Sequence, residues 1–141
     1  ATAEDAVRGA DIICLCTSAQ EPPVIAEWIA PGAHVTSVGF NPPGGELDSA
    51  LIEEGRLFVE SYDAFQPAPV GCPELQGRDP ATATELGEVI SGNAPGRESA
   101  EEITMYKSMG HAMEDVVTAN LVYQAAVAEG AGTHFVMENR S

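Results

Sequence analysis

Short apolar runs alternate with segments of helical character along the first two thirds of the chain. Residues 11–17, 34–39 and 57–60 are compact runs rich in β-branched and aliphatic side chains, which predicts three strands. A helix tail over residues 3–8 precedes the first strand, and a helix over residues 48–53 precedes the third. Apolar strands that alternate with helices indicate a buried parallel sheet with right-handed crossovers. The pattern therefore predicts an α/β fold.

The middle of the chain is punctuated by proline and glycine. Residues 66–77 are rich in both and predict a loop. Residues 79–92 predict a helix, because Asp79 is a good N-cap and a proline follows it at the first helical position. This helix would place Glu85 and Glu88 one turn apart. They fit a solvated helix face better than an acid/base pair.

A change of hydrophobic period marks the end of the chain. Residues 103–107 alternate apolar and polar side chains like a half-buried strand, and from Met109 onward the apolar positions recur at helical spacing. Ser108 lies at the change of period and is the expected N-cap, directly after the only lysine, Lys107. Residues 135–137 predict one more short strand. A strand that opens directly into a helix is where open α/β sheets bind ligands.

Composition excludes several classes of partner. The chain has 141 residues, enough for about one domain, and its 22 acidic against six basic residues give a net charge of −16. Clustered cations are needed to bind nucleic acid or an anionic membrane, so neither partner is expected. No run approaches the ~18 apolar residues of a membrane span. Three sparse cysteines favour a reducing cytoplasm over a disulfide framework, and no spacing suggests a metal site.

Small polar groups or glycine follow three of the expected strands. Because parallel strands end at the same edge of a sheet, these groups are expected to lie together where doubly wound folds hold a dinucleotide. Each one alone fits an ordinary strand-to-loop cap, and the coincidence of three favours a ligand site. The three segments are Thr17-Ser18, Gly39-Phe40-Asn41 and Lys107-Ser108.

Three motifs in this order resemble the ornithine cyclodeaminase/mu-crystallin family of NAD(P)-dependent enzymes. They are SVGFNPPGGELD at residues 37–48, ELGEVISG at residues 85–92 with a Pro-Gly-Arg at residues 95–97, and EITMYKSMGHAMED at residues 102–115. The resemblance covers residues 11 to about 137 and corresponds to the C-terminal half of the family. It implies an NAD or NADP cofactor and a small imino- or amino-acid substrate.

The resemblance also implies roles for residues at the sheet edge. Thr17 and Ser18 match the loop that flanks the adenosine of the cofactor, whereas Val38 and Gly39 match the loop that lines the nicotinamide. Ser108 resembles a residue at the nicotinamide end.

Lys107 matches a family lysine, which makes it a further candidate for cofactor binding. A strand-end lysine is also a common counter-charge, here for Glu85, Glu114 or Asp115. Both interpretations stay open.

Asn41 is the main departure from the cyclodeaminase pattern, and it is the catalytic candidate of this chain. The cyclodeaminases hold an aspartate there as acid/base, and an amide does not exchange protons near neutral pH. Asn41 therefore orients a substrate, which favours a ketimine reductase or an amino-acid dehydrogenase. Two alternatives are NAD-assisted cyclodeamination of ornithine to proline and ammonia, and a non-catalytic, crystallin-like module that binds cofactor.

The sequence contains no G-x-G-x-x-G phosphate-binding turn. In the family this turn lies upstream, so the chain is expected to be a C-terminal portion that is inactive alone. Residues 1–100 are then a partial, Rossmann-like NAD(P)-binding domain. Residues 101–141 hold the last strand and a long helix that returns to a catalytic domain missing here. The resemblance also implies a homodimer for the intact protein.

Overall fold

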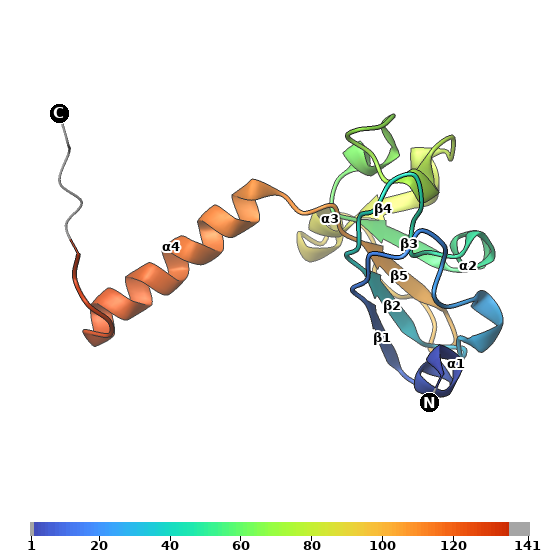
Figure 1. The fold of residues 1–141 in the computed structure, drawn as a ribbon, viewed down its shortest axis with the longest axis horizontal. Helices are drawn as coiled ribbons and strands as arrows, with labels where there is room; N and C mark the ends of the chain where they lie inside the picture. Colours follow the sequence, from blue (N-terminus) through green and yellow to red (C-terminus); the bar gives the residue numbers. More distant parts are fainter. Residues whose placement is uncertain (1, 136–141) are drawn as a thin grey trace. The chain divides into compact units, whose positions relative to one another are not determined.

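A single parallel sheet organises the first part of the molecule (Figure 1). The structure, a computed structural model, describes residues 2–135. All strand pairs are parallel, in the order β1-β2-β5-β3-β4. The predicted α/β class is confirmed. The strands are β1 (Ile12–Leu15), β2 (His34–Ser37), β3 (Arg56–Val59), β4 (Ala83–Glu85) and β5 (Thr104–Lys107).

One face of this sheet carries the hydrophobic core. Alternate strand residues point to the same face, and on this face they are nearly all inaccessible to solvent. Leu51 and Ile52 of α2 (Ser49–Glu54) join the same core. The strand members of the core are Ile13, Leu15, Val35, Leu57, Val59, Ala83 and Met105.

The two early helices begin and end where their capping residues predict. Thr2 forms a capping box with Asp5 at the start of α1 (Ala3–Val7). Asp48 accepts a hydrogen bond from the backbone of Ala50 at the start of α2, which ends at Gly55. The helix expected over residues 48–53 is thus confirmed.

The helix predicted over residues 79–92 is wrong. Asp79 does cap a helical start, but only a single 3-10 turn follows it, Pro80–Thr82, and the chain then enters β4. Ala83 pairs with Leu57 of β3 and is buried, so pairing with the sheet outweighs the local helix signal. The helix α3 (Leu86–Ile90) follows β4.

Because of this extra strand, Glu85 and Glu88 do not share a helix face. Glu85 ends β4 and accepts a hydrogen bond from the backbone of Tyr62 at 2.8 Å, whereas Glu88 is exposed on α3. An acid/base pair formed by these two side chains is therefore not supported.

Residues 110–141 form a separate unit from residues 1–109. This second unit contains α4 (Ala112–Glu129), whose N-cap is His111, so the prediction of Ser108 as N-cap is wrong. Ser108 still extends the sheet, because its N–H donates to the carbonyl of Ser37. Gly110 has a φ of +78°, which lies outside the range of an α-helix, so the helix begins only after this residue. Within residues 2–135, no helix is long and apolar enough to cross a membrane. The strand predicted over residues 135–137 lies largely outside the described residues.

Candidate functional site

The ends of three strands meet at one edge of the sheet, as expected from their parallel direction. Leu15, Ser37 and Lys107 are aligned in the strand register. The chain beyond them stays paired, because Val38 donates to the carbonyl of Leu15 at 3.1 Å and Ser108 donates to that of Ser37 at 2.9 Å. The segments that carry Thr17, Gly39 and Ser108 therefore leave the sheet side by side.

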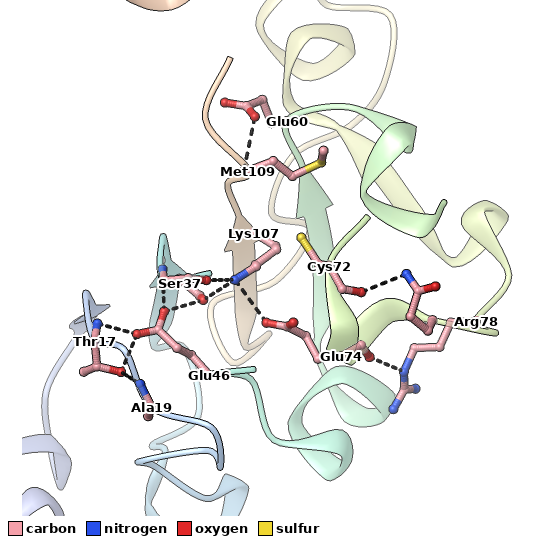
Figure 2. A network of polar contacts seen from close by, with 12 residues as sticks. Thr17, Ala19, Ser37, Glu46, Glu60, Cys72, Glu74, Arg78, Lys107 and Met109 are labelled. Carbon is pink, nitrogen blue, oxygen red and sulfur yellow. Dashed lines mark hydrogen bonds and ion pairs between the residues drawn. The ribbon is translucent and has the colours of Figure 1, made fainter. Parts of the chain in front are cut away.

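A buried carboxylate joins two of these segments (Figure 2). Glu46 is 1% exposed, and each of its two carboxylate oxygens accepts two hydrogen bonds. Oε1 accepts hydrogen bonds from the backbone N–H of Thr17 at 2.5 Å and from its hydroxyl at 2.7 Å. Oε2 accepts from the Ser37 hydroxyl and from the Gly39 N–H, each at 2.7 Å. The carboxylate thus ties the loop after β1 to the loop after β2.

The hydrogen bonds determine how Glu46 titrates. Burial opposes the charged form, but the four donors from Thr17, Ser37 and Gly39 outweigh it, and the pKa of Glu46 falls below its ordinary value of 4.5. Glu46 is therefore ionised at neutral pH.

Lys107 lies behind the same loop and is completely buried. Its Nζ donates to the Ser37 hydroxyl at 3.0 Å and to the Gly39 carbonyl at 2.6 Å, and it pairs with Glu74 Oε1 at 3.0 Å. The counter-ion of Lys107 is thus Glu74, from the 3-10 turn Pro73–Leu75, and not one of the carboxylates considered from the sequence. The ammonium group of Lys107 thus has three polar partners, all of them beneath the loop.

A buried thiol lies beside this ion pair (Figure 2). Burial is the main reason why the pKa of Cys72 rises to about 11, and the carboxylates of Glu74 and Glu60 raise it further while Lys107 lowers it. The thiol is therefore neutral at physiological pH and is no candidate nucleophile.

Glycine is required where the two loops touch. A Cβ on Gly39 would lie 2.4 Å from the carbonyl oxygen of Thr17 and 2.4 Å from the Glu46 carboxyl carbon. A Cβ on Gly44 would lie 1.9 Å from the carbonyl oxygen of Gln20. Any side chain at either position would push the loops apart, so the glycines of this motif allow the close approach of two backbones.

Asn41 lies at the same junction, on the solvent side. Its Nδ2 donates to the carbonyl of Ser18 at 2.5 Å, which fixes the amide so that Oδ1 is left as the acceptor. Two apolar side chains of the same loop, Val38 and Phe40, are each 47% exposed. This edge therefore presents hydroxyls, an amide and an apolar surface together.

The third segment is held from the neighbouring strand. Glu60, at the end of β3, accepts a hydrogen bond from the Ser108 hydroxyl at 3.4 Å and from the Met109 N–H at 3.2 Å. The structure thus brings Thr17, Ser18, Val38, Gly39, Asn41 and Ser108 to one edge, with Lys107 below them.

The sequence prediction included Lys107 but neither Glu46 nor Glu74. Both carboxylates come from loops, and no periodicity distinguishes a buried loop acid from the many exposed acids of this chain. The one local signal is the buried Leu47 next to Glu46, which indicates that this part of the loop enters the interior. Within the described residues, no group of three or more His, Cys, Asp or Glu side chains is placed to hold a metal ion.

Comparisons with known proteins identify relatives of this chain. The chain is 43% identical over 123 residues to the ketimine reductase mu-crystallin of Mus musculus, covering 86% of this chain and 38% of that protein. It is 40% identical over 134 residues to the Delta(1)-pyrroline-2-carboxylate reductase of Bacillus cereus, covering 91% of this chain and 41% of that protein.

Solved structures give the same result. The Delta(1)-pyrroline-2-carboxylate reductase of Thermococcus litoralis, in complex with NADH and L-proline, superposes with a TM-score of 0.79 at 35% identity, over 95% of this chain and 43% of that one. The chain thus spans 38 to 43% of the length of these relatives. The family model for the ornithine cyclodeaminase/mu-crystallin family matches residues 1–130, and this chain belongs to that family.

Proposed function

We propose that this chain is the C-terminal part of an NAD(P)-dependent reductase that converts a cyclic imino acid into the corresponding amino acid. The reductases named above support this proposal through 40 to 43% identity over most of the chain. Since the chain spans less than half of each relative, an upstream segment with the phosphate-binding turn is part of the proposal. A homodimer and a cytoplasmic location belong to it as well.

The sheet edge has chemical groups suited to the two ends of such a cofactor. Thr17 and Ser18 are exposed polar residues suited to the adenosine side, and Val38 with Gly39 is suited to line the nicotinamide ring. The half-exposed Val38 side chain offers an apolar contact, and Ser108 follows the adjacent strand. Bound NAD(P)H supplies the hydride.

The fixed amide of Asn41 is the observation that carries the choice of reaction. With Nδ2 donating to Ser18, Oδ1 is free to accept a hydrogen bond from the N–H of a protonated imine. Reduction of that ion transfers a hydride to the imine carbon, and the imine nitrogen keeps the proton that it already carries. The step therefore needs no proton from Asn41. Cyclodeamination requires proton transfers to and from water and ammonia, for which an amide is unsuited.

Steady-state assays of the intact protein test this proposal. We expect Δ1-pyrroline-2-carboxylate with NADH or NADPH to give loss of reduced cofactor and formation of proline in equal amounts. Release of ammonia from ornithine without net change in NADH would instead support cyclodeamination. Cofactor binding without turnover of any imino acid would support a crystallin-like binding module.

An amino-acid dehydrogenase is the second candidate. The alanine dehydrogenase of Archaeoglobus fulgidus is 32% identical over 142 residues, covering 93% of this chain and 42% of that protein. A dehydrogenase of this kind, running in the direction of reduction, would use the same hydride transfer on an imine formed from a keto acid and ammonia. Turnover of pyruvate that depends on ammonia, with no turnover of the cyclic imine, would favour this alternative.

A further inference from the structure

Gly39 is held from both sides by buried charged side chains of opposite sign. Its N–H donates to Glu46 Oε2 at 2.7 Å, and its carbonyl accepts from Lys107 Nζ at 2.6 Å. Both charged groups are removed from solvent, with Glu46 at 1% and Lys107 at 0% exposure. Gly39 has no side chain that could anchor it, and a Cβ at this position has no room.

Ser37 connects the two charges behind the loop. Its hydroxyl donates its one hydrogen to Glu46 Oε2 at 2.7 Å and accepts a hydrogen bond from Lys107 Nζ at 3.0 Å. The two hydrogen bonds are therefore compatible with each other. The other oxygen of Glu46 holds the N–H and the hydroxyl of Thr17. One carboxylate therefore sets the spacing between the loop after β1 and the loop after β2 (Figure 2).

We propose that Glu46 and Lys107 are positioning residues that together hold the loops of Thr17 and Gly39 in the arrangement required to bind the nicotinamide cofactor. This inference rests on the function proposed above. Neither side chain needs to touch the cofactor, since both are buried below it and act through backbone atoms of the loops.

The charged character of these residues supports a positioning role over simple packing. Removing a carboxylate and an ammonium from water costs several kcal/mol each, and apolar side chains of similar volume often stabilise a fold as well or better. Here the charges are directed at backbone N–H and C=O groups of one loop, where only hydrogen-bonding groups give a defined orientation. The adjacent Glu74 balances Lys107 and keeps the ammonium in place.

The first test compares Glu46→Gln with Glu54→Gln in the intact protein. The glutamine keeps the size of Glu46, but its NH₂ group must face the backbone N–H of either Thr17 or Gly39, so in both orientations two donors oppose each other. Loss of a charge-assisted hydrogen bond of ~1.5–3 kcal/mol corresponds to a rise of about 10- to 100-fold in the Kd for NADH. We expect kcat at saturating NADH to change by less than about 10-fold, because the reacting groups remain. Glu54 is exposed at the end of α2, and its variant should match the wild type.

Amide hydrogen exchange without cofactor provides a readout that does not depend on the proposed function. Glu46→Gln should speed exchange in residues 17–19 and 38–41 by about 10-fold or more, and leave β2 and β5 protected. Lys107→Met, made together with Glu74→Gln so that no buried carboxylate loses its counter-charge, should loosen residues 38–41 alone. That contrast follows because Lys107 contacts Gly39 but Glu46 holds both loops.

The outcomes separate this inference from the proposed function. If the wild type binds no NAD(P)H, the proposed function fails. Hydrogen exchange still tests whether Glu46 and Lys107 hold the loops of Thr17 and Gly39. If the wild type binds NADH and a folded Glu46→Gln protein binds it equally well, with unchanged exchange at both loops, the positioning role is overturned. Should the glutamine variant not fold, Glu46→Asp keeps the charge but is one methylene too short to reach both loops, and the same exchange pattern is expected.

Discussion

At the scale of single residues, Asn41 is the side chain whose chemistry best separates the reactions considered under the proposed function. Its amide is fixed by the carbonyl of Ser18, so that the same side chain that joins two loops also presents an acceptor to solvent. An aspartate at this position would carry a charge and could exchange protons. The difference of one atom type thus separates a hydrogen-bonding residue from an acid/base residue.

Replacement of Asn41 by alanine should mainly affect the imino acid. We expect kcat/KM for Δ1-pyrroline-2-carboxylate to fall about 10- to 100-fold, since a hydrogen bond to a charged group is worth ~1.5–3 kcal/mol. The Kd for NADH should change by less than about threefold, because Glu46 still holds the loops of Thr17 and Gly39 together in the variant. Steady-state kinetics and a fluorescence titration measure the two effects. Asn93→Ala, in the exposed linker after α3, is the matched control.

Glu46 should also make stability depend on pH. Its pKa is lower in the folded protein than its ordinary value of 4.5, because its hydrogen bonds outweigh its burial. Its contribution is therefore fully present above pH 4.5 and is lost as the pH falls through the lowered folded pKa. Urea unfolding measures this effect. The difference in the free energy of unfolding between wild type and Glu46→Gln should shrink as the pH is lowered from neutral to pH 3. A gap that stays constant with pH would contradict the ionised carboxylate.

At the scale of elements, the sequence predicts β1, β2 and β3 because each is a short apolar run, and β5 because its apolar and polar residues alternate before a change to helical spacing. It misses β4, since the cap at Asp79 is a true local signal that serves only one 3-10 turn. What ends that turn is the burial of Ala83 beside Leu57, a contact between residues far apart in the sequence. Local rules therefore fail where long-range packing decides the conformation.

The same distinction applies to the candidate site. Thr17, Gly39 and Ser108 follow predictable strands, and parallel pairing alone brings them to one edge. Glu46 and Glu74 instead come from loops whose path depends on the finished core. The acidic composition of the chain hides them further, because buried and exposed carboxylates look alike in a sequence.

The helix α4 has an unusual surface for a helix with no buried residue. Apolar side chains occur around its whole circumference, and a helix of this kind is normally enclosed by other parts of a protein. The exposed apolar members are Met113, Val116, Val117, Leu121, Val122, Tyr123 and Val127.

Hydrogen exchange should reveal this difference between elements. In the chain of residues 1–141, amides of α4 should exchange far faster than those of β2 and β5, because an isolated helix of 18 residues is only marginally stable in water. In the intact protein the same amides should be protected at least about 100-fold more, if the helix returns to a catalytic domain. Equal protection in both proteins would contradict that role for α4.

At the scale of the whole molecule, the described sheet supplies only one side of a dinucleotide site. β1 pairs with β2 alone, and the sequence holds no glycine-rich turn that leads into a helix N-terminus. That turn is where backbone N–H groups hold a pyrophosphate in doubly wound folds. The loops of Thr17 and Gly39 can contact the two ends of a cofactor but leave its most strongly charged part without donors.

Affinity for the cofactor should therefore depend on the upstream segment that the proposed function includes. We expect the chain of residues 1–141 to bind NADH at least about 100-fold more weakly than the intact protein and to show no turnover, since loss of several charge-assisted phosphate contacts costs ~3 kcal/mol or more. Nicotinamide fluorescence during a titration measures both affinities. Adding the upstream segment as a separate polypeptide should restore binding, because the contacts, and not the covalent link, form the site. Tight binding by residues 1–141 alone would mean that the phosphates are held by groups other than a glycine-rich turn.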